Sequence, residues 1–222
     1  MKNIKWYKII PIFINLFVII STLAIIIIDG SQSGEFYGIN FFKKYTVDSN
    51  LLLAISSLPL LIYEIKDYRK DDAKLPRWSV ILYFVGVVTI SLTFLVVVFF
   101  LTPTFIRDDK SPAWLYTDEN LFFHIINPIL GVIMYLFVID EHPLGIKHCL
   151  LPFIPIGIYE AIYTSCVLTN TWTDFYGFTF GGKYELTPII IIVILLISFL
   201  VGMLLNKFHN RLVFAHNRVP IM

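Results

Sequence analysis

The chain has 222 residues, of which 57% are apolar and only 15% are charged, and its mean hydropathy is +0.77. A soluble domain carries roughly 25% charged residues, so this composition indicates a polytopic membrane protein and excludes intrinsic disorder. A net charge of +1 provides no field for binding nucleic acid, and two cysteines cannot staple a chain of this length into a disulfide-rich domain.

A membrane-spanning helix needs about 20 consecutive, mostly apolar residues. Six stretches meet this requirement, at residues 9–28, 45–63, 79–101, 120–139, 149–170 and 186–206. The apolar part of the first stretch is longer than that of a signal peptide, so we expect it to be retained. None of the six alternates strictly between apolar and polar residues, as the strands of a membrane barrel would. The sequence therefore predicts an all-α fold, with a single six-helix transmembrane domain over residues 1–222.

Basic residues flank these stretches unevenly. Twelve of the 17 Lys and Arg residues fall in the N-terminal segment, the 64–78 loop, the 140–148 turn and the C-terminal tail. Because short cytoplasmic loops carry the excess of positive charge, we expect both termini to be cytoplasmic in a cell membrane. The loops 29–44, 102–119 and 171–185 would then face outward. Their aromatic residues either anchor the protein at the membrane interface or fold over the bundle and cover a site.

Polar side chains inside membrane spans are costly, so each of them suggests a function. On the fourth span, the spacing of Asn120, His124 and Asn127 places all three on one helix face. Pro128 follows them, and because proline has no N–H it leaves the carbonyl group of His124 without its helical donor. We expect this face to point into the bundle.

The second span begins with a similar pattern, in which Thr46 and Asn50 are four residues apart and share a face. The second and fourth spans enter the membrane from the same side, so Thr46 and His124 should lie within about 6 Å of the same membrane face. Polar residues are also present elsewhere in the second span and in the fifth: Asp48, Tyr159, Glu160 and Tyr163.

Each of these residues also has a purely structural interpretation. The Thr46 hydroxyl could hydrogen-bond to the backbone of its own helix, and Asn50 and Asn127 could form interhelical hydrogen bonds. Glu160 could be a protonated packing partner of a tyrosine. For metal or cofactor chemistry the sequence has no H-x-x-x-H or H-E-x-x-H motif, no G-x-S-x-G elbow and no phosphate-binding glycine pattern. We therefore expect neither a metal nor a cofactor.

Two short motifs carry a family resemblance. The stretch Tyr45-Thr46-Val47-Asp48-Ser49-Asn50-Leu51-Leu52 and the later stretch Phe123-His124-Ile125-Ile126-Asn127-Pro128 resemble the androgen-induced and androgen-dependent membrane hydrolases and their bacterial relatives. The outward loop with Trp172, Asp174, Phe175, Tyr176 and Gly177 is similar as well. The resemblance implies hydrolysis of fatty acid esters of hydroxy fatty acids by an intramembrane threonine and histidine, which fall on Thr46 and His124. The spacing from threonine to asparagine is one residue longer than in the animal members.

This chemistry also makes sense from the residues alone. A threonine hydroxyl is a poor nucleophile at neutral pH and needs an adjacent base. Histidine is the side chain best suited to accept and return that proton. An amide of Asn50, Asn120 or Asn127 could donate to the oxyanion, a contribution of about 3 kcal/mol per donor in soluble enzymes.

The leading interpretation is an intramembrane hydrolase of lipid esters, whose partners would be a fatty acid ester and the bilayer. Further candidates for substrate binding are Asp48, Tyr159, Glu160, Tyr163, Trp172 and Asp174. Two alternatives stay open. In a small transporter or channel, Asp48, His124 and Glu160 would relay protons or ions, and in a non-catalytic component the bundle would bind a lipid or a partner protein. The sequence leaves the oligomeric state open.

Overall fold

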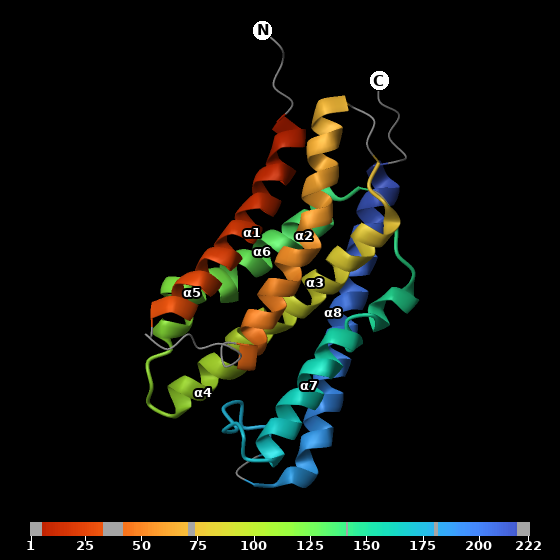
Figure 1. Ribbon diagram of the computed structural model, residues 1–222. Helices are drawn as coiled ribbons and strands as arrows, with labels where there is room; N and C mark the ends of the chain where they lie inside the picture. Colours follow the sequence, from red (N-terminus) through yellow and green to blue (C-terminus); the bar gives the residue numbers. More distant parts are fainter. Residues whose placement is uncertain (1–5, 33–41, 71–73, 141, 180–181, 217–222) are drawn as a thin grey trace.

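The structure, a computed structural model, describes residues 6–32, 42–70, 74–140, 142–179 and 182–216 (Figure 1). All regular elements within these ranges are helical, and six helices are long and apolar enough to cross a membrane. The predicted all-α fold with six spans is therefore confirmed. The first helix begins and the last helix ends at the same end of the bundle (Figure 1), as an even number of spans requires.

The six spans are built from helical elements of unequal length. The first two are α1 (Trp6–Gln32) and α2 (Tyr45–Lys70). The third combines α3 (Arg77–Val96), the π-helix η2 (Val97–Leu101) and α4 (Thr102–Arg107). The fourth follows the 3-10 helix η3 (Ala113–Tyr116) and combines α5 (Asp118–Leu121), η4 (Phe122–Ile126), α6 (Asn127–Ile133) and η5 (Met134–Val138). The last two are η6 (Ile146–Leu150) with α7 (Phe153–Leu168), and η7 (Tyr184–Leu186) with α8 (Thr187–His216).

Most spans are longer than the sequence predicts. The third span continues to Arg107, into the segment 102–119 that was expected to be an outward loop. Uncharged runs mark only the part of a helix that lies in hydrocarbon, and helices extend past this part into the polar interface. The fifth span, Ile146–Leu168, has about the predicted length but is shifted toward the N-terminus. Its α-helix ends at Leu168, and Asn170 lies in a turn with φ of 55°.

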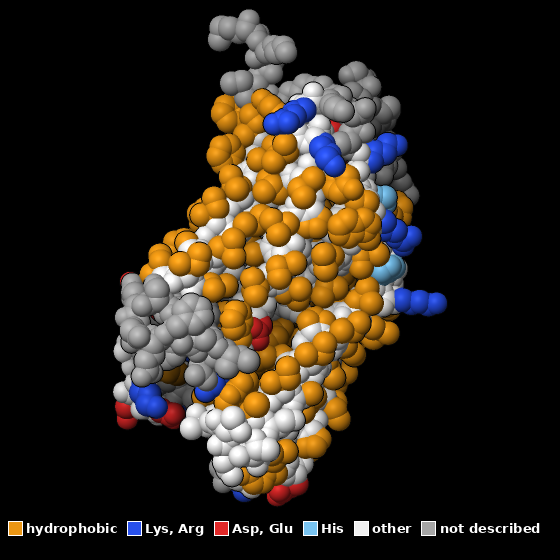
Figure 2. All heavy atoms as spheres, in the orientation of Figure 1, with side chains coloured by type: hydrophobic (Ala, Val, Ile, Leu, Met, Phe, Trp, Pro, Cys, Tyr) orange, Lys and Arg blue, Asp and Glu red, His pale blue; other side chains and the backbone are white. Residues whose placement is uncertain are grey.

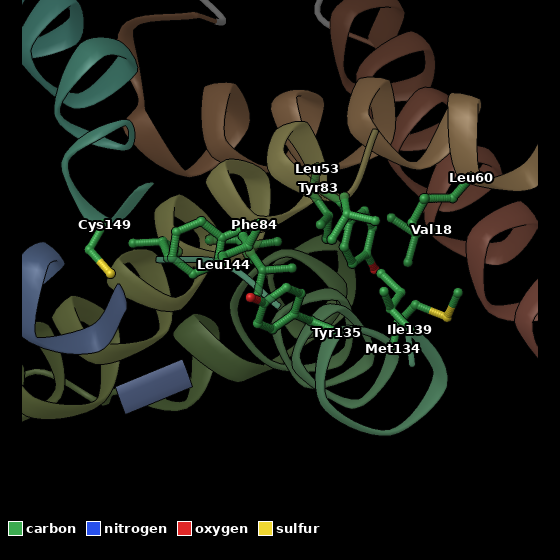
Figure 3. Close-up of a cluster of buried hydrophobic side chains, with 14 residues drawn as sticks. Val18, Leu53, Leu60, Tyr83, Phe84, Met134, Tyr135, Ile139, Leu144 and Cys149 are labelled. Carbon is green, nitrogen blue, oxygen red and sulfur yellow. The ribbon is translucent and has the colours of Figure 1, made fainter. Parts of the chain in front are cut away.

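The core of the bundle is built around α3, most of which is buried. Its aromatic side chains Tyr83 and Phe84 pack against residues of α1, α2 and the fourth span (Figure 3). The other labelled members of this cluster are Val18, Leu53, Leu60, Met134, Tyr135, Ile139, Leu144 and Cys149. The hydrophobic effect does not drive helices together inside a bilayer, because lipid tails are as apolar as these side chains. Close van der Waals packing therefore has to hold this core together.

The outer surface of the bundle is apolar around its middle. Large hydrophobic side chains are exposed on every span, and they cover most of the visible face (Figure 2). Soluble proteins rarely expose such an extended apolar surface, whereas a bilayer solvates it. On this face the Lys and Arg side chains gather mostly toward the end where α1 begins and α8 ends (Figure 2). The structure thus has the surface of a multi-pass membrane protein.

Glycine allows α2 and α3 to approach closely. A Cβ atom added to Gly86 would lie 2.6 Å from Oγ of Ser56 and 3.2 Å from Cα of Leu53. The Ser56 hydroxyl donates to the Leu53 carbonyl at 2.8 Å, so it is not free to move away. We expect Gly86→Ala to lower the free energy of unfolding by about 1–3 kcal/mol, the usual cost of overpacking.

Thermal unfolding in detergent, followed by circular dichroism, measures this effect. Gly157→Ala is the matched control, because a Cβ atom at Gly157 on α7 meets nothing within 4 Å. That substitution should be neutral or slightly stabilising, since alanine favours helix over glycine. Equal midpoints for the two variants would show that the α2–α3 contact is looser than described.

Candidate functional site

Thr46 and His124 line the same cavity. Thr46 lies in the first turn of α2 and His124 lies in the π-helix η4, both toward the end of the bundle away from the start of α1 (Figure 1). Both contribute to the wall of a cavity of about 350 Å³, which Lys43 and Lys44 also line. The structure thus brings a hydroxyl group and an imidazole into one space, which we call the Thr46–His124 cavity.

A backbone carbonyl group fixes the ring of His124. Nδ1 of His124 lies 2.7 Å from the carbonyl oxygen of Leu115 in η3, and both side chains are buried. Because a carbonyl oxygen can only accept a hydrogen bond, Nδ1 carries the proton and Nε2 keeps its lone pair. A general base needs a fixed ring with a free lone pair, and this contact provides both for His124.

The π-helical turn around His124 follows from Pro128. Proline offers no N–H to the His124 carbonyl group, and η4 forms the wider i→i−5 pattern in its place. In this pattern the N–H of Asn127 donates to the carbonyl of Phe122 instead of that of Phe123. The carbonyl group of Phe123 is therefore released from its own helix and can accept a hydrogen bond from a neighbouring helix.

Asn50 uses this carbonyl group to fasten α2 to the fourth span. Its Nδ2 donates to the carbonyl oxygen of Phe123 at 3.1 Å and to that of Thr46 at 2.8 Å. Its Oδ1 accepts from Nδ2 of Asn127 at 2.9 Å. One fully buried amide group thereby sets the backbone of Thr46 relative to the helical turn that carries His124.

These contacts correct one expectation about the amides. Both N–H groups of Asn50 serve backbone carbonyls, and Nδ2 of Asn127 donates to Asn50 and to the Thr22 hydroxyl at 3.3 Å. Neither amide has an N–H left for an oxyanion, so both fit the interhelical interpretation. Asn120 differs, because it lines the Thr46–His124 cavity and uses one N–H for the carbonyl of Trp114 at 3.1 Å. Its second N–H remains for a ligand.

The loop after α7 is organised around Asp174. Its carboxylate accepts hydrogen bonds from the Tyr163 hydroxyl at 2.8 Å, from the N–H groups of Phe178 and Thr179 at 2.9 Å and 2.7 Å, and from the Thr179 hydroxyl at 2.6 Å. Burial raises the pKa of Asp174, but these hydrogen bonds outweigh it and hold the pKa below its ordinary value. Gly177, with φ of 71°, lets the loop turn back. Asp174 and Tyr163, expected to bind substrate, thus hold the loop in shape.

This loop covers the site. The hydroxyl oxygen of Tyr176 accepts the backbone N–H of Tyr45 at 3.1 Å, and the N–H of Tyr176 donates to the Tyr163 hydroxyl at 3.0 Å. Phe175 and Tyr176 line the Thr46–His124 cavity. The aromatic residues of the outward loops were expected either to anchor the protein at the membrane interface or to cover a site. Phe175 and Tyr176 fold over the cavity.

The remaining candidates lie around two neighbouring spaces. Asp48, Tyr159 and Trp172 line a mostly apolar cavity of about 620 Å³ between α2 and α7. Figure 2 shows a hollow on this face of the bundle with carboxylate side-chain atoms inside it. Glu160 lines a small chamber of about 40 Å³ together with Tyr159 and Thr46. The structure therefore separates Asp48 and Trp172 from His124 but keeps Glu160 near Thr46.

Sequence reasoning missed the carbonyl group of Leu115, which no pattern of side chains reveals. It also missed the two lysines, Lys43 and Lys44, because charged residues just outside a span are usual at membrane interfaces. Pro128 was the one signal of the π-helical turn, since prolines in membrane helices often accompany such bulges.

Within the described ranges, no group of three or more His, Cys, Asp and Glu side chains is placed to hold a metal ion. No protein-family model, no curated protein and no solved structure matches the chain. The comparisons therefore bear on neither the fold nor the chemistry.

Proposed function

We propose that this protein is an intramembrane hydrolase of lipid esters, in which Thr46 is the nucleophile and His124 the general base, and that it belongs with the androgen-induced and androgen-dependent membrane hydrolases. One observation supports the proposal most: Thr46 and His124 line one cavity while the Leu115 carbonyl holds His124 in the tautomer with a free Nε2.

The first half of the reaction uses these groups in order. Nε2 of His124 takes the proton of the Thr46 hydroxyl, and the oxygen attacks the ester carbonyl carbon. The free N–H of Asn120 and the positive end of the α2 dipole, beside Thr46, stabilise the negative charge that develops on the carbonyl oxygen. His124 then returns its proton to the leaving oxygen, which releases the alcohol and leaves an acyl group on Thr46.

The apolar part of the cavity suits an acyl chain. Leu101, Phe105 and Phe123 line it, and they would contact hydrocarbon, while Lys43 and Lys44 give its rim positive charge. A fatty ester in the bilayer already has its chain at this depth. The substrate class that we propose is therefore a fatty acid ester.

Labelling with a fluorophosphonate probe tests this function. The probe should react with Thr46 of the purified protein, because an activated hydroxyl displaces its fluoride, and mass spectrometry should find the adduct on the peptide that carries Thr46. Ser49→Ala is the matched control, since Ser49 lies one turn further along α2 but donates to the Thr46 carbonyl and bonds to Thr93 instead. Labelling that survives in Thr46→Ala would contradict the proposal.

We also propose that both termini are cytoplasmic, so that the Thr46–His124 cavity opens toward the outer leaflet. The support is the excess of basic residues near the termini. In a background without Cys149 and Cys166, single cysteines at the exposed positions Ser111 and Lys183 should react with an impermeant maleimide added to intact cells.

Cysteines at Lys74 and Lys147, which are also exposed, should react only after the cells are lysed. The reverse pattern would place the cavity in the inner leaflet and would leave the fold unchanged. Ser79 is buried and therefore unsuited to this labelling, and Ser33 and Asn217 lie outside the described residues.

A further inference from the structure

Glu160 is a buried carboxyl group that the acylation half of the reaction does not use. It lies midway along α7 with 4% of its surface exposed. Its Oε2 has no hydrogen-bond partner among the described residues. A carboxyl group in such a place is costly unless it faces a ligand, water or another polar group, so the space beside it decides its role.

That space is the small chamber of about 40 Å³, which Glu160 lines together with Thr46, Thr93 and three tyrosines, Tyr45, Tyr159 and Tyr176. Each water molecule needs at least about 10–15 Å³ of such volume and two or more polar partners. The chamber therefore has room for about three water molecules. Hydroxyl groups on its wall supply the partners that these water molecules need.

Thr46 lies between this chamber and the Thr46–His124 cavity. Both spaces have Thr46, Leu101 and Tyr176 in their walls, while His124 lines only the larger one and Glu160 only the smaller one. An acyl group bonded to Thr46 Oγ1 would thus have His124 and the departing alcohol on one side. Water in the small chamber would lie on the other side, next to Glu160.

We propose that Glu160 is the general base for hydrolysis of the acyl group on Thr46, acting on a water molecule in the small chamber; this inference rests on the proposed function. The Glu160 carboxylate takes one proton from the water as its oxygen bonds to the acyl carbonyl carbon. The bond between that carbon and Thr46 Oγ1 then breaks, and the proton on Glu160 passes to Thr46 Oγ1. The products are the free fatty acid and the restored threonine.

Glu160→Gln tests this division of labour, because it keeps the shape and removes the base. With a chromogenic fatty ester, the first turnover should still release one alcohol per protein in a rapid burst. Steady-state hydrolysis should then fall by about 10²-fold or more, the usual contribution of a general base. Acid quenching followed by mass spectrometry should find the acyl group accumulated on the peptide that carries Thr46.

Glu64→Gln is the control, because Glu64 is also a carboxyl group on a membrane-spanning helix, although it is only partly buried. It accepts hydrogen bonds from Asn15 at 2.9 Å and lines a separate cavity that shares no residue with the small chamber. Its steady-state rate should stay within about twofold of the wild type, with no trapped acyl group.

Two outcomes would overturn the role of Glu160: an unchanged steady-state rate in Glu160→Gln, or a loss of the burst and the steady state together without trapped acyl group. If Glu160→Gln does not fold, Glu160→Ala with added formate is the alternative test. Formate is small enough for the enlarged chamber, and it should restore the steady-state rate if a carboxylate is the base. Failure of the proposed function gives a different result, since then Thr46 of the wild type carries neither an acyl group nor the fluorophosphonate adduct.

Discussion

Thr46→Ala and His124→Ala are each expected to lower the turnover of a medium-chain fatty ester by about 10³-fold or more, and the double variant should be no worse than either single one. A hydroxyl without its base and a base without its hydroxyl are equally unable to form the acyl group. Hydrolysis in detergent or nanodiscs, with protein amounts matched by absorbance, measures these rates. The thermal midpoint of Thr46→Ala should be unchanged or slightly higher, because it removes a polar group from an apolar region. The midpoint of His124→Ala should be lower, because it leaves the buried Leu115 carbonyl group without its donor.

Thr46→Ser is the conservative control for this prediction. It keeps a hydroxyl in the first turn of α2 and should retain a measurable part of the activity, with fluorophosphonate labelling at the same position. If Thr46→Ala keeps near wild-type turnover while His124→Ala is inactive, threonine is not the nucleophile. Water activated by His124 would then be the better mechanism.

The same variants separate a hydrolase from a transporter. A proton or ion relay would depend on Asp48, and Thr46→Ala would then be mild while Asp48→Asn would be severe. The structure favours the opposite order, because Asp48 lines the cavity between α2 and α7 and not the one that contains His124. Near wild-type ester hydrolysis by Asp48→Asn is the expected result.

The fold and the central pair were accessible from the sequence because each depends on local rules. Hydropathy marks six spans, and the direction of each span fixes which of its ends shares a membrane face with another. Thr46 and His124 both stand near the start of spans that enter from the same side, so their meeting in one cavity follows from counting residues. No contact between distant residues had to be known.

The rest depends on contacts that periodicity does not encode. An amide on a helix face gives no sign whether its N–H groups face a ligand or a carbonyl, and Asn50 and Asn127 differ from Asn120 only in this respect. An α-helical turn before Pro128 would free the carbonyl group of His124, whereas the π-helical turn frees that of Phe123, which becomes the partner of Asn50. The position of Glu160 beside Thr46 requires knowing how α7 is rotated.

Asn50→Ala is expected to be the most disruptive single change outside the proposed catalytic pair, Thr46 and His124. It would leave the carbonyl group of Phe123 and an N–H of Asn127 without the partner they now have, while the Thr46 carbonyl would lose one of its donors and keep the Ser49 hydroxyl. Each buried polar group without a partner costs about 1–3 kcal/mol, so we expect the free energy of unfolding to fall by roughly 2 kcal/mol or more. A shift of about 1 Å between the Thr46 and His124 helices would also lower turnover by about 10²-fold.

Asn50→Asp separates the donor role of Asn50 from its acceptor role, because it keeps the shape and the acceptor for Asn127 but has no N–H for the two carbonyl groups. It should lose stability and turnover much as alanine does. Ser57→Ala is the matched control, since the buried Ser57 hydroxyl on the same helix donates to the Leu53 carbonyl of its own span. It should change neither quantity much. If Asn50→Ala loses stability but keeps full turnover well below its unfolding temperature, the amide holds the bundle together without positioning Thr46 against His124. If Asn50 joins the Thr46 carbonyl to the π-helical turn as described, Asn50→Ala should lose both stability and turnover, and Ser57→Ala should lose neither.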